Sequence, residues 1–338
     1  MNIAINGFGR IGRQALRIIL KHHPELTVVL INDLTDDATL AHLFQFDSTY
    51  GTFDGDVAIK EGNLVIGGKS ITSTAEKDPA MLPHRDLHVD VVLECTGVFR
   101  TREQCKMHLD AGAKKVIISA PAKDEIDGTF VIGVNEETYD PTTMHILSNA
   151  SCTTNCLAPM VKVIHENFTI KEGFMTTIHS YTNDQRILDF PHKDLRRARS
   201  AAENIIPTST GAAKAIGLVL PELQGKLDGI SIRVPTPTGS ITDLVSVIEK
   251  DVTADAVNAA FKTAATGKLK GILGYEERPL VLKDFVGDPR SCIIDAQNTT
   301  VIRAGGVTLL KTLAWYDNEW GYSNRLVELA KIVGNRVQ

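Results

Sequence analysis

A glycine-rich turn close to the N-terminus is the feature that most restricts how this chain can fold. Residues 7–12 read Gly-Phe-Gly-Arg-Ile-Gly and lie between a short β-type segment at residues 2–6 and an apolar helical pattern at residues 11–22. In a strand–turn–helix unit of this kind, the glycines allow a tight bend, close approach of the backbone to a pyrophosphate, and close packing of helix on strand. The pyrophosphate would lie at the helix N-terminus. The residues expected to contact a dinucleotide there are Gly7, Gly9, Arg10, Ile11 and Gly12.

An acidic residue follows the next predicted strand. Residues 26–31 form a continuous apolar run, typical of a buried parallel strand, and Asp33 comes about 20 residues after the last glycine of the turn. A carboxylate at this place binds ribose hydroxyls and repels an additional 2′-phosphate, and no arginine occurs in residues 34–37. We therefore predict NAD rather than NADP as the cofactor. The alternative is that Asp33 caps a helix or forms a turn.

Further strand-like segments occur at residues 89–93 and 115–118, and each is followed by small residues, at 95–97 and 119–121. Small residues after parallel strands allow chain and cofactor to approach each other closely. We expect an open parallel sheet, a Rossmann dinucleotide-binding domain, over residues 1–150. A length of 338 residues leaves room for a second domain.

Composition excludes several classes of protein. The formal net charge of -5, from 36 Lys and Arg against 41 Asp and Glu, gives no general attraction to nucleic acid or anionic lipid. The 5 cysteines form no C-x-x-C pair, which fits neither a disulfide framework nor a four-cysteine zinc site. No secretion signal and no apolar run of about 20 residues is evident. We predict a cytoplasmic protein whose primary partner is neither a membrane nor a nucleic acid.

Cys152 is the candidate nucleophile. It precedes a largely apolar helical stretch at residues 157–168 and would lie near a helix N-terminus. There the backbone dipole lowers a thiol pKa and backbone N–H groups can stabilise an oxyanion. Pro159 complicates this prediction, because a proline beyond the first turn removes a hydrogen bond and kinks a helix. Cys156, one helical turn further on, is interpreted as a buried structural thiol, with a resolving or metal-binding role as the alternatives.

His179 is the best-placed partner for this thiol among the 10 histidines, because it follows a β-like run at residues 173–178. The alternative is an ordinary surface or core histidine. His84 and His88 have the spacing of a metal-binding pair on a helix, but no third ligand is evident nearby, and we predict no metal site.

Polar and basic residues gather in residues 180–199 and again in residues 207–211. Hydroxyls, a glycine and arginines are the groups that bind a phosphate. From the residues alone, a solvated loop or a subunit contact explains the same segment equally well.

Taken together, five segments closely resemble the family of phosphorylating glyceraldehyde-3-phosphate dehydrogenases. They are INGFGRIGR at 5–13, SNASCTTNC at 148–156, HSYTNDQ at 179–185, RVPTP at 233–237 and WYDNE at 315–319. The resemblance implies that a cysteine attacks the aldehyde of glyceraldehyde 3-phosphate and that the hemithioacetal passes hydride to NAD. Inorganic phosphate then cleaves the resulting thioester to give 1,3-bisphosphoglycerate.

The resemblance also implies a role for individual residues. Cys152 would be the nucleophile, and His179 would activate the thiol and act as general acid and base. The further implied contacts are Lys77, Ser119 and Asn318 for NAD, Thr182, Arg197 and Arg233 for the substrate phosphate, and Ser151, Thr153, Thr210 and Gly211 for the attacking phosphate.

The fold implied by the resemblance is α/β. It comprises the Rossmann domain at 1–150, a mixed α/β catalytic domain with a large antiparallel sheet at 151–317, and a C-terminal segment at 318–338 whose helix, about 321–333, returns to the first domain. Family members assemble as homotetramers, in which residues 180–202 would lie near a neighbouring subunit's cofactor. Phe190 stands in that loop where NAD-specific members usually carry leucine, and its effect on the adenosine pocket stays open.

Two other functions are compatible with parts of this pattern. Erythrose-4-phosphate dehydrogenase shares the Cys and His, but its thioester is hydrolysed by water. A non-catalytic NAD-binding redox sensor would use Cys152 chiefly as an oxidisable thiolate. Residues 32–35 and 233–237 look more like the glyceraldehyde-3-phosphate enzyme.

Overall fold

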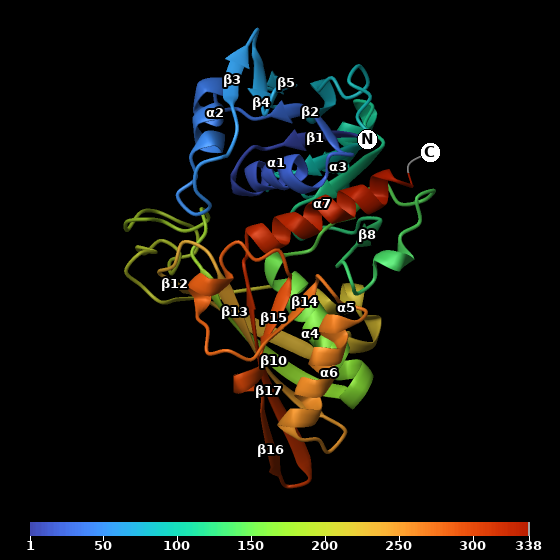
Figure 1. Ribbon diagram of the computed structural model, residues 1–338, viewed down its shortest axis with the longest axis vertical. Coiled ribbons are helices and arrows are strands. Elements are labelled where there is room, and N and C mark those ends of the chain that lie inside the picture. Colours follow the sequence, from blue (N-terminus) through green and yellow to red (C-terminus); the bar gives the residue numbers. More distant parts are fainter. Residues whose placement is uncertain (337–338) are drawn as a thin grey trace. The chain divides into compact units, whose positions relative to one another are not determined.

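Two units, each with its own sheet, make up residues 1–336, the part of the chain that the computed structural model describes (Figure 1). Residues 337–338, the end of the expected C-terminal segment, lie outside the described residues. Unit 1 comprises residues 1–130, 136–150 and the chain from Ser323 onward, and unit 2 comprises residues 131–135 and 151–322.

Unit 1 contains a nine-stranded sheet with the strand order β3-β4-β5-β2-β1-β6-β7-β9-β8. All neighbours from β5 to β8 are parallel, whereas β3, β4 and β5 pair antiparallel. The central strands are buried on both faces, which explains their continuous apolar sequences. The strands are β1 (Asn2–Asn6), β2 (Thr27–Asn32), β3 (Val57–Lys60), β4 (Asn63–Ile66), β5 (Lys69–Thr74), β6 (Val91–Glu94), β7 (Lys115–Ile118), β8 (Gly128–Thr129) and β9 (Ile146–Ser148).

Two helices of unit 1, α2 and α3, begin at residues whose side chains cap them. The side chain of Asp36 accepts a hydrogen bond at the start of α2, and Thr101 and Gln104 form a capping box on α3. Gly9 caps α1 without a side-chain hydrogen bond. The helices are α1 (Arg10–His22), α2 (Asp37–Gln45), α3 (Arg102–Asp110) and α7 (Trp320–Gly334), of which α7 begins in unit 2.

Unit 2 contains an eight-stranded mixed sheet in which most neighbours are antiparallel. Its order is β11-β12-β10-β13-β17-β15-β14, with β16 pairing only to β17, and the parallel pairs are β10 with β12 and β14 with β15. The strands are β10 (Ile170–Ser180), β11 (Ile206–Ser209), β12 (Leu227–Val234), β13 (Ser240–Ile248), β14 (Leu273–Glu276), β15 (Cys292–Asp295), β16 (Thr300–Ala304) and β17 (Val307–Tyr316).

Unit 2 also contains three α-helices, which are α4 (Cys152–Phe168), α5 (Ile216–Val219) and α6 (Ala254–Thr266). The buried face of α4 packs against the sheet and α6 packs against α4 (Figure 1). Pro159 lies inside α4, and the helix continues through it to Phe168. The expected complication therefore does not end the helix, and Cys152 is its first residue.

The predicted fold class is confirmed, because a Rossmann sheet and a mixed, mostly antiparallel sheet are both present. The predicted strands at 2–6 and 115–118 are β1 and β7, and the helix predicted at 11–22 begins one residue earlier, at Arg10. Sequence reasoning missed β3 to β5. Within residues 1–336, no helix is both long and apolar enough to cross a bilayer.

Candidate active site

A thiol and an imidazole meet in unit 2. The Sγ atom of Cys152, at the start of α4, lies 3.4 Å from Nε2 of His179. Two different elements supply these side chains, since His179 is the penultimate residue of β10. The histidine is predicted to follow a strand, and the structure places it inside one, where the ladder fixes its backbone.

The other ring nitrogen of His179 has two neighbours. Nδ1 lies 2.7 Å from the carbonyl oxygen of Ser180 and 2.8 Å from Nη1 of Arg233. Parallel pairing of β10 with β12 places His179 directly opposite Arg233. The two contacts favour opposite tautomers, because the carbonyl accepts a proton from Nδ1 whereas the guanidinium donates one to it.

The expectation of a lowered thiol pKa at Cys152 is wrong for this geometry. Burial raises the pKa of the Cys152 thiol, and this effect exceeds the opposing effects of Arg233 and of hydrogen bonds at the start of α4. Burial, together with the charge of Arg233, lowers the pKa of His179 to about 3. The pair is therefore a neutral thiol beside a neutral imidazole.

Tyr316, at the end of β17, is a site residue that sequence reasoning missed. Its ring packs edge-on against that of His179, with centroids 6.1 Å apart. Its hydroxyl lies 2.9 Å from Oγ1 of Thr153 and 2.8 Å from Oγ1 of Thr177. Tyr316 thereby joins the start of α4 to β10. Its one visible signal in the sequence is its place in the WYDNE segment.

Two arginines of the candidate substrate-phosphate group lie near each other. Arg197 is close enough to Arg233 to lower the pKa of the Arg233 guanidinium, an effect that adds to burial. Arg197 also forms an ion pair with Asp184 and donates to Oγ1 of Thr208 at 3.0 Å. Thr182 is tied to Gln185 through its carbonyl oxygen, which accepts a hydrogen bond at 2.8 Å. An incoming anion would compete with Asp184 for Arg197.

The residues expected to bind the attacking phosphate come from two loops. The Ser151 hydroxyl caps α4 by accepting from the backbone N–H of Thr154 at 3.0 Å, and Thr153 is buried against Tyr316. In the second loop, Oγ1 of Thr210 accepts from the N–H of Ala212 at 3.2 Å. A Cβ on Gly211 would meet no atom within 4 Å, so the backbone there is open.

The glycine-rich turn of unit 1 has the shape of a cofactor cradle. Gly7 has a φ of 90°, and a Cβ on it would come within 2.6 Å of the backbone nitrogen of Thr96. A Cβ on Gly12 would come within 2.3 Å of the Gly7 oxygen, whereas one on Gly9 would meet nothing within 4 Å. Gly7 and Gly12 are thus needed for packing, and Gly9 leaves the start of α1, at Arg10 and Ile11, open to a ligand. These residues fit a bound pyrophosphate.

The other predicted NAD contacts are placed as follows. The Asp33 carboxylate accepts from the N–H of Phe8 at 2.8 Å, so it lies beside the turn. Ser119 follows β7 and hydrogen-bonds the Cys95 thiol, and Lys77 is exposed. In unit 2, Oδ1 of Asn318 accepts from the backbone N–H of Gly239 at 2.9 Å.

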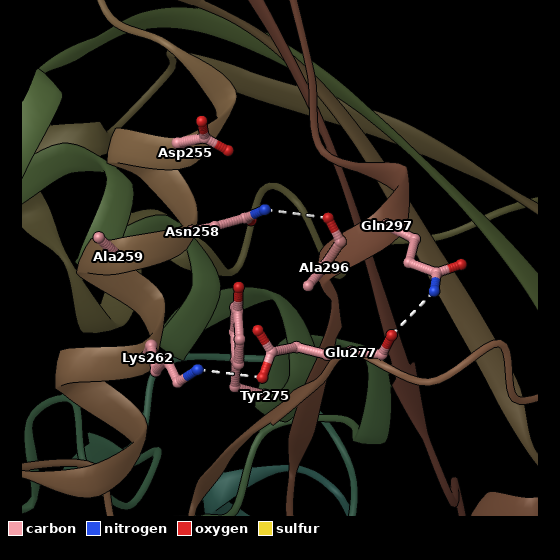
Figure 2. Close-up of a pocket in the computed structure, with 8 residues that line it drawn as sticks. All are labelled: Asp255, Asn258, Ala259, Lys262, Tyr275, Glu277, Ala296 and Gln297. Atoms are coloured by element: carbon pink, nitrogen blue, oxygen red, sulfur yellow. Dashed lines mark hydrogen bonds and ion pairs between the residues drawn. The ribbon is translucent and has the colours of Figure 1, made fainter.

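A polar hollow of about 460 Å³ lies elsewhere in unit 2, between α6, β14 and the turn after β15 (Figure 2). Two of its charged groups are paired, because Nζ of Lys262 lies 3.0 Å from the Glu277 carboxylate, and this ammonium group also lies over the ring of Tyr275. The hollow contains none of the predicted site residues.

The two histidines with metal-pair spacing are not a pair in the structure. His84 is buried and lies 3.0 Å from His108, not from His88. Among residues 1–336, no group of three or more His, Cys, Asp or Glu side chains is arranged to hold a metal ion.

Comparisons with known proteins agree over the whole chain. The family model for "Glyceraldehyde 3-phosphate dehydrogenase, NAD binding domain" matches residues 1–102, and the model for its C-terminal domain matches residues 151–318. The glyceraldehyde-3-phosphate dehydrogenase of Geobacillus stearothermophilus is 58% identical over 336 residues, 99% of each chain. "Glyceraldehyde-3-phosphate dehydrogenase 2" of Streptomyces avermitilis is 56% identical over 337 residues, 100% of this chain and 99% of the relative.

The match extends to both units and is far above what a shared fold alone would give. Together with the contact between Cys152 and His179 and the glycine-rich cradle, it shows that this chain belongs to the glyceraldehyde-3-phosphate dehydrogenase family.

Proposed function

We propose that this chain oxidises glyceraldehyde 3-phosphate to 1,3-bisphosphoglycerate with NAD and inorganic phosphate, through a hemithioacetal and a thioester on Cys152. The single observation that carries this proposal is the 3.4 Å contact between the Cys152 thiol and the His179 imidazole. Membership of the family and the NAD-binding turn of unit 1 support it.

Cys152 and His179 would carry the covalent steps. The sulfur bonds to the aldehyde carbon while the thiol proton moves to Nε2 of His179, which passes it to the aldehyde oxygen to give the hemithioacetal hydroxyl. Nε2, free again, accepts that hydroxyl proton as the hydride leaves. Bound NAD supplies the acceptor for the hydride that leaves the hemithioacetal carbon. An oxygen of inorganic phosphate then attacks the thioester carbonyl, and the thiolate leaves and regains a proton.

Arg233 would couple substrate binding to the state of the base. While its guanidinium donates to Nδ1 of His179, the ring carries its proton on Nε2 and cannot accept one from the thiol. A substrate phosphate that draws the guanidinium away leaves the Ser180 carbonyl as the partner of Nδ1. The Nδ1–H tautomer then presents a basic Nε2 to Cys152.

We infer two anion sites from the residues around this pair. Arg233, Arg197 and Thr182 would hold the phosphate of the substrate, since the charge of Arg197 reaches Arg233 and lowers the pKa of its guanidinium. Ser151 and Thr153 would bind the attacking phosphate through backbone N–H groups at the start of α4, because the Thr153 hydroxyl is engaged by Tyr316. Thr210 and Gly211 would complete this second site.

Unit 1 would bind NAD at its glycine-rich turn, with Asp33 on the adenosine ribose and Lys77 and Ser119 along the groove. Asn318 would orient the nicotinamide carboxamide through its amide nitrogen, because its oxygen already accepts from Gly239. We retain residues 1–150, 151–317 and 318–338 as the functional domains.

A homotetramer in the cytoplasm is also proposed. In the loop after β10, Ile187, Leu188, Phe190, Leu195 and Ile205 are each at least 66% exposed. A cluster of exposed large apolar side chains within one loop is typical of a protein interface. This supports the prediction that residues 180–202 contact a neighbouring subunit.

The test is NADH formation by purified protein from NAD and glyceraldehyde 3-phosphate, with and without inorganic phosphate, alongside Cys152→Ser. We expect rapid phosphate-dependent turnover that the substitution abolishes. Turnover that does not depend on phosphate and prefers erythrose 4-phosphate would instead identify an erythrose-4-phosphate dehydrogenase. Binding of NAD without turnover of either sugar would favour the redox-sensor alternative.

A further inference from the structure

Polar side chains cross the carboxyl ends of four adjacent parallel strands in unit 1. Thr74 ends β5, Asn32 ends β2, Asn6 ends β1 and Glu94 ends β6, and the strands lie in that order in the sheet. The order of the strands changes direction at β1: β2 is added on one side of β1, and β6 is added on the other. Open α/β sheets bind their ligands at such a switch point. Each of these four side chains is hydrogen-bonded to the next or to the turn beyond it.

Glu94 is the charged member of this row and is 1% exposed. Its Oε1 accepts from the backbone N–H of Thr96 at 2.9 Å and from the Thr96 hydroxyl. Its Oε2 accepts from Nδ2 of Asn6 at 2.6 Å and lies 3.2 Å from Nε2 of His108. Among the described residues, no Lys or Arg forms an ion pair with Glu94.

The backbone of Glu76 fixes the direction of every hydrogen bond in the row. Its N–H donates to Oδ1 of Asn32 at 2.8 Å, and its carbonyl accepts from Nδ2 of Asn32 at 2.9 Å. The same Nδ2 donates to Oδ1 of Asn6 at 2.7 Å, so Nδ2 of Asn6 must face Glu94. Position 94 therefore needs an acceptor on its Asn6 side.

The turn after β6 demands an acceptor on the other side, because the backbone N–H of Thr96 can only donate. Two acceptors at position 94 are provided by a carboxylate, and by neither an amide nor a protonated carboxyl. Burying a carboxylate costs free energy unless donors surround it, so the donors on both sides of position 94 explain why a buried charge is retained there.

Two histidines support the carboxylate from behind. Burial and the neighbouring His108 lower the pKa of His84 to about 3, so His84 is neutral. Nε2 of His84 lies 3.0 Å from Nδ1 of His108, and when the His84 N–H donates to Nδ1, the neutral His108 ring carries its single N–H proton on Nε2, facing Glu94. In this tautomer, His108 donates to the carboxylate.

The turn that Glu94 fixes is packed directly against the glycine-rich turn. A Cβ on Gly7 would lie 2.6 Å from the nitrogen of Thr96 and 2.8 Å from the carbonyl carbon of Cys95. The backbone N–H of Cys95 donates to the backbone carbonyl oxygen of Asn6 at 2.7 Å. Any shift of residues 95–97 therefore displaces the backbone that faces the cofactor.

We propose that Glu94 is a positioning residue for NAD, whose ionised carboxylate holds the 95–97 turn and the glycine-rich turn in one fixed arrangement before the cofactor binds. The proposal rests on the proposed function only in that unit 1 binds NAD. Glu94 itself does not touch the cofactor in this scheme. It acts through Thr96 and Asn6.

The first variant is Glu94→Gln, which keeps the size of the side chain and places one donor opposite either Asn6 or Thr96. Relief of that conflict displaces the turns in the free protein, and NAD must restore them on binding. We expect the Kd for NAD, measured by titration calorimetry, and the KM for NAD to rise about tenfold or more. The KM for glyceraldehyde 3-phosphate and kcat at saturating NAD should stay within about twofold of the unsubstituted enzyme.

The second variant, Asn6→Asp combined with Glu94→Gln, moves the carboxylate one place along the row. Both oxygens at position 6 then accept, from Asn32 and from the new amide, and the amide oxygen still accepts from Thr96. The His108 ring can switch tautomer to accept the second amide proton. We expect this double substitution to restore most of the lost NAD affinity, although Glu94→Gln alone weakens it.

Lys115→Met is the matched control for loss of stability. Its buried ammonium group donates to the carbonyl oxygens of Pro141 and Met144, at the opposite end of β7 from Ser119. This variant should lower the melting temperature without changing the Kd for NAD. If Glu94→Gln also lowers only the melting temperature, or if the double substitution restores nothing, the proposal is overturned.

If Glu94→Gln does not yield folded protein, Thr96→Val decides. This variant removes the hydroxyl that bridges Glu94 and the N–H of Val98 while the carboxylate stays in place. A severalfold rise in the Kd for NAD supports the proposal, and an unchanged Kd refutes it. Failure of the proposed function is separate, since it would show as absent turnover in the unsubstituted enzyme whatever the variants do to NAD binding.

Discussion

Arg233 offers the most direct test of the electrostatics at Cys152. Arg233 lowers the pKa of the thiol, and it does so against the larger opposite effect of burial. Arg233→Met removes the positive charge and keeps a long side chain in the same space. We expect the thiol pKa to rise, because the thiolate then loses its nearest described cation.

The size of the effect follows from the geometry of the three groups. The contacts on the two sides of the His179 ring are 3.4 Å and 2.8 Å, so the guanidinium lies roughly 8 Å from the sulfur. Two unit charges at roughly 8 Å interact by about 2 kcal/mol at an effective dielectric constant of about 20. That energy corresponds to about 1.5 pKa units, or a roughly thirtyfold smaller thiolate fraction at pH values below the pKa.

The assay is the rate of Cys152 alkylation by iodoacetamide between pH 6 and pH 10, followed by peptide mass spectrometry. Iodoacetamide is uncharged, so the loss of an anion site does not alter its access. Arg233→Lys is the matched control and should keep the midpoint within about half a pH unit. A midpoint for Arg233→Met that equals or lies below that of the unsubstituted enzyme would refute the reasoning.

Three further substitutions give clear expectations. His179→Asn removes the proton acceptor, and kcat for NADH formation should fall by about 10²–10⁴; a loss under tenfold would contradict its role. Asp33→Ala should lower the ratio of kcat/KM with NAD to kcat/KM with NADP by at least about tenfold, since no carboxylate then repels the 2′-phosphate. An unchanged ratio would show that Asp33 serves only the structure of the turn. Tyr316→Phe removes the hydroxyl that hydrogen-bonds both Thr153 and Thr177, and it should lower the free energy of unfolding by about 1–3 kcal/mol in urea titrations. An unchanged free energy of unfolding would show that the two threonine hydroxyls find other partners.

Local patterns predicted the elements that carry the chemistry. The glycine spacing and the apolar run after it place β1, the turn and α1 almost to the residue, since each depends only on neighbours in sequence. The helical stretch at 157–168 is predicted for the same reason, and the structure extends it to begin at Cys152, although Pro159 inside it argues against continuity.

Burial and long-range pairing account for what the sequence did not reveal. The thiol pKa moves opposite to the expectation from the helix dipole, because desolvation of the half-buried Cys152 side chain exceeds the opposing effects of Arg233 and of hydrogen bonds at the start of α4. The ion pair of Arg197 with Asp184 joins residues 13 positions apart in an irregular loop. Glu94 gave one signal, an acid at the end of an apolar strand, but its partners come from β1 and α3.

The parallel register of β10 and β12 has an evolutionary consequence. Side chains alternate between the two faces of a strand, so inserting or deleting one residue within either strand would send Arg233 to the opposite face from His179. Register changes only by whole residues, so evolution cannot shift the two strands in smaller steps that keep both side chains on one face. Changes of chain length are therefore confined to the connections outside Gly173–Ser180 and Leu227–Val234 for as long as the two side chains must act together.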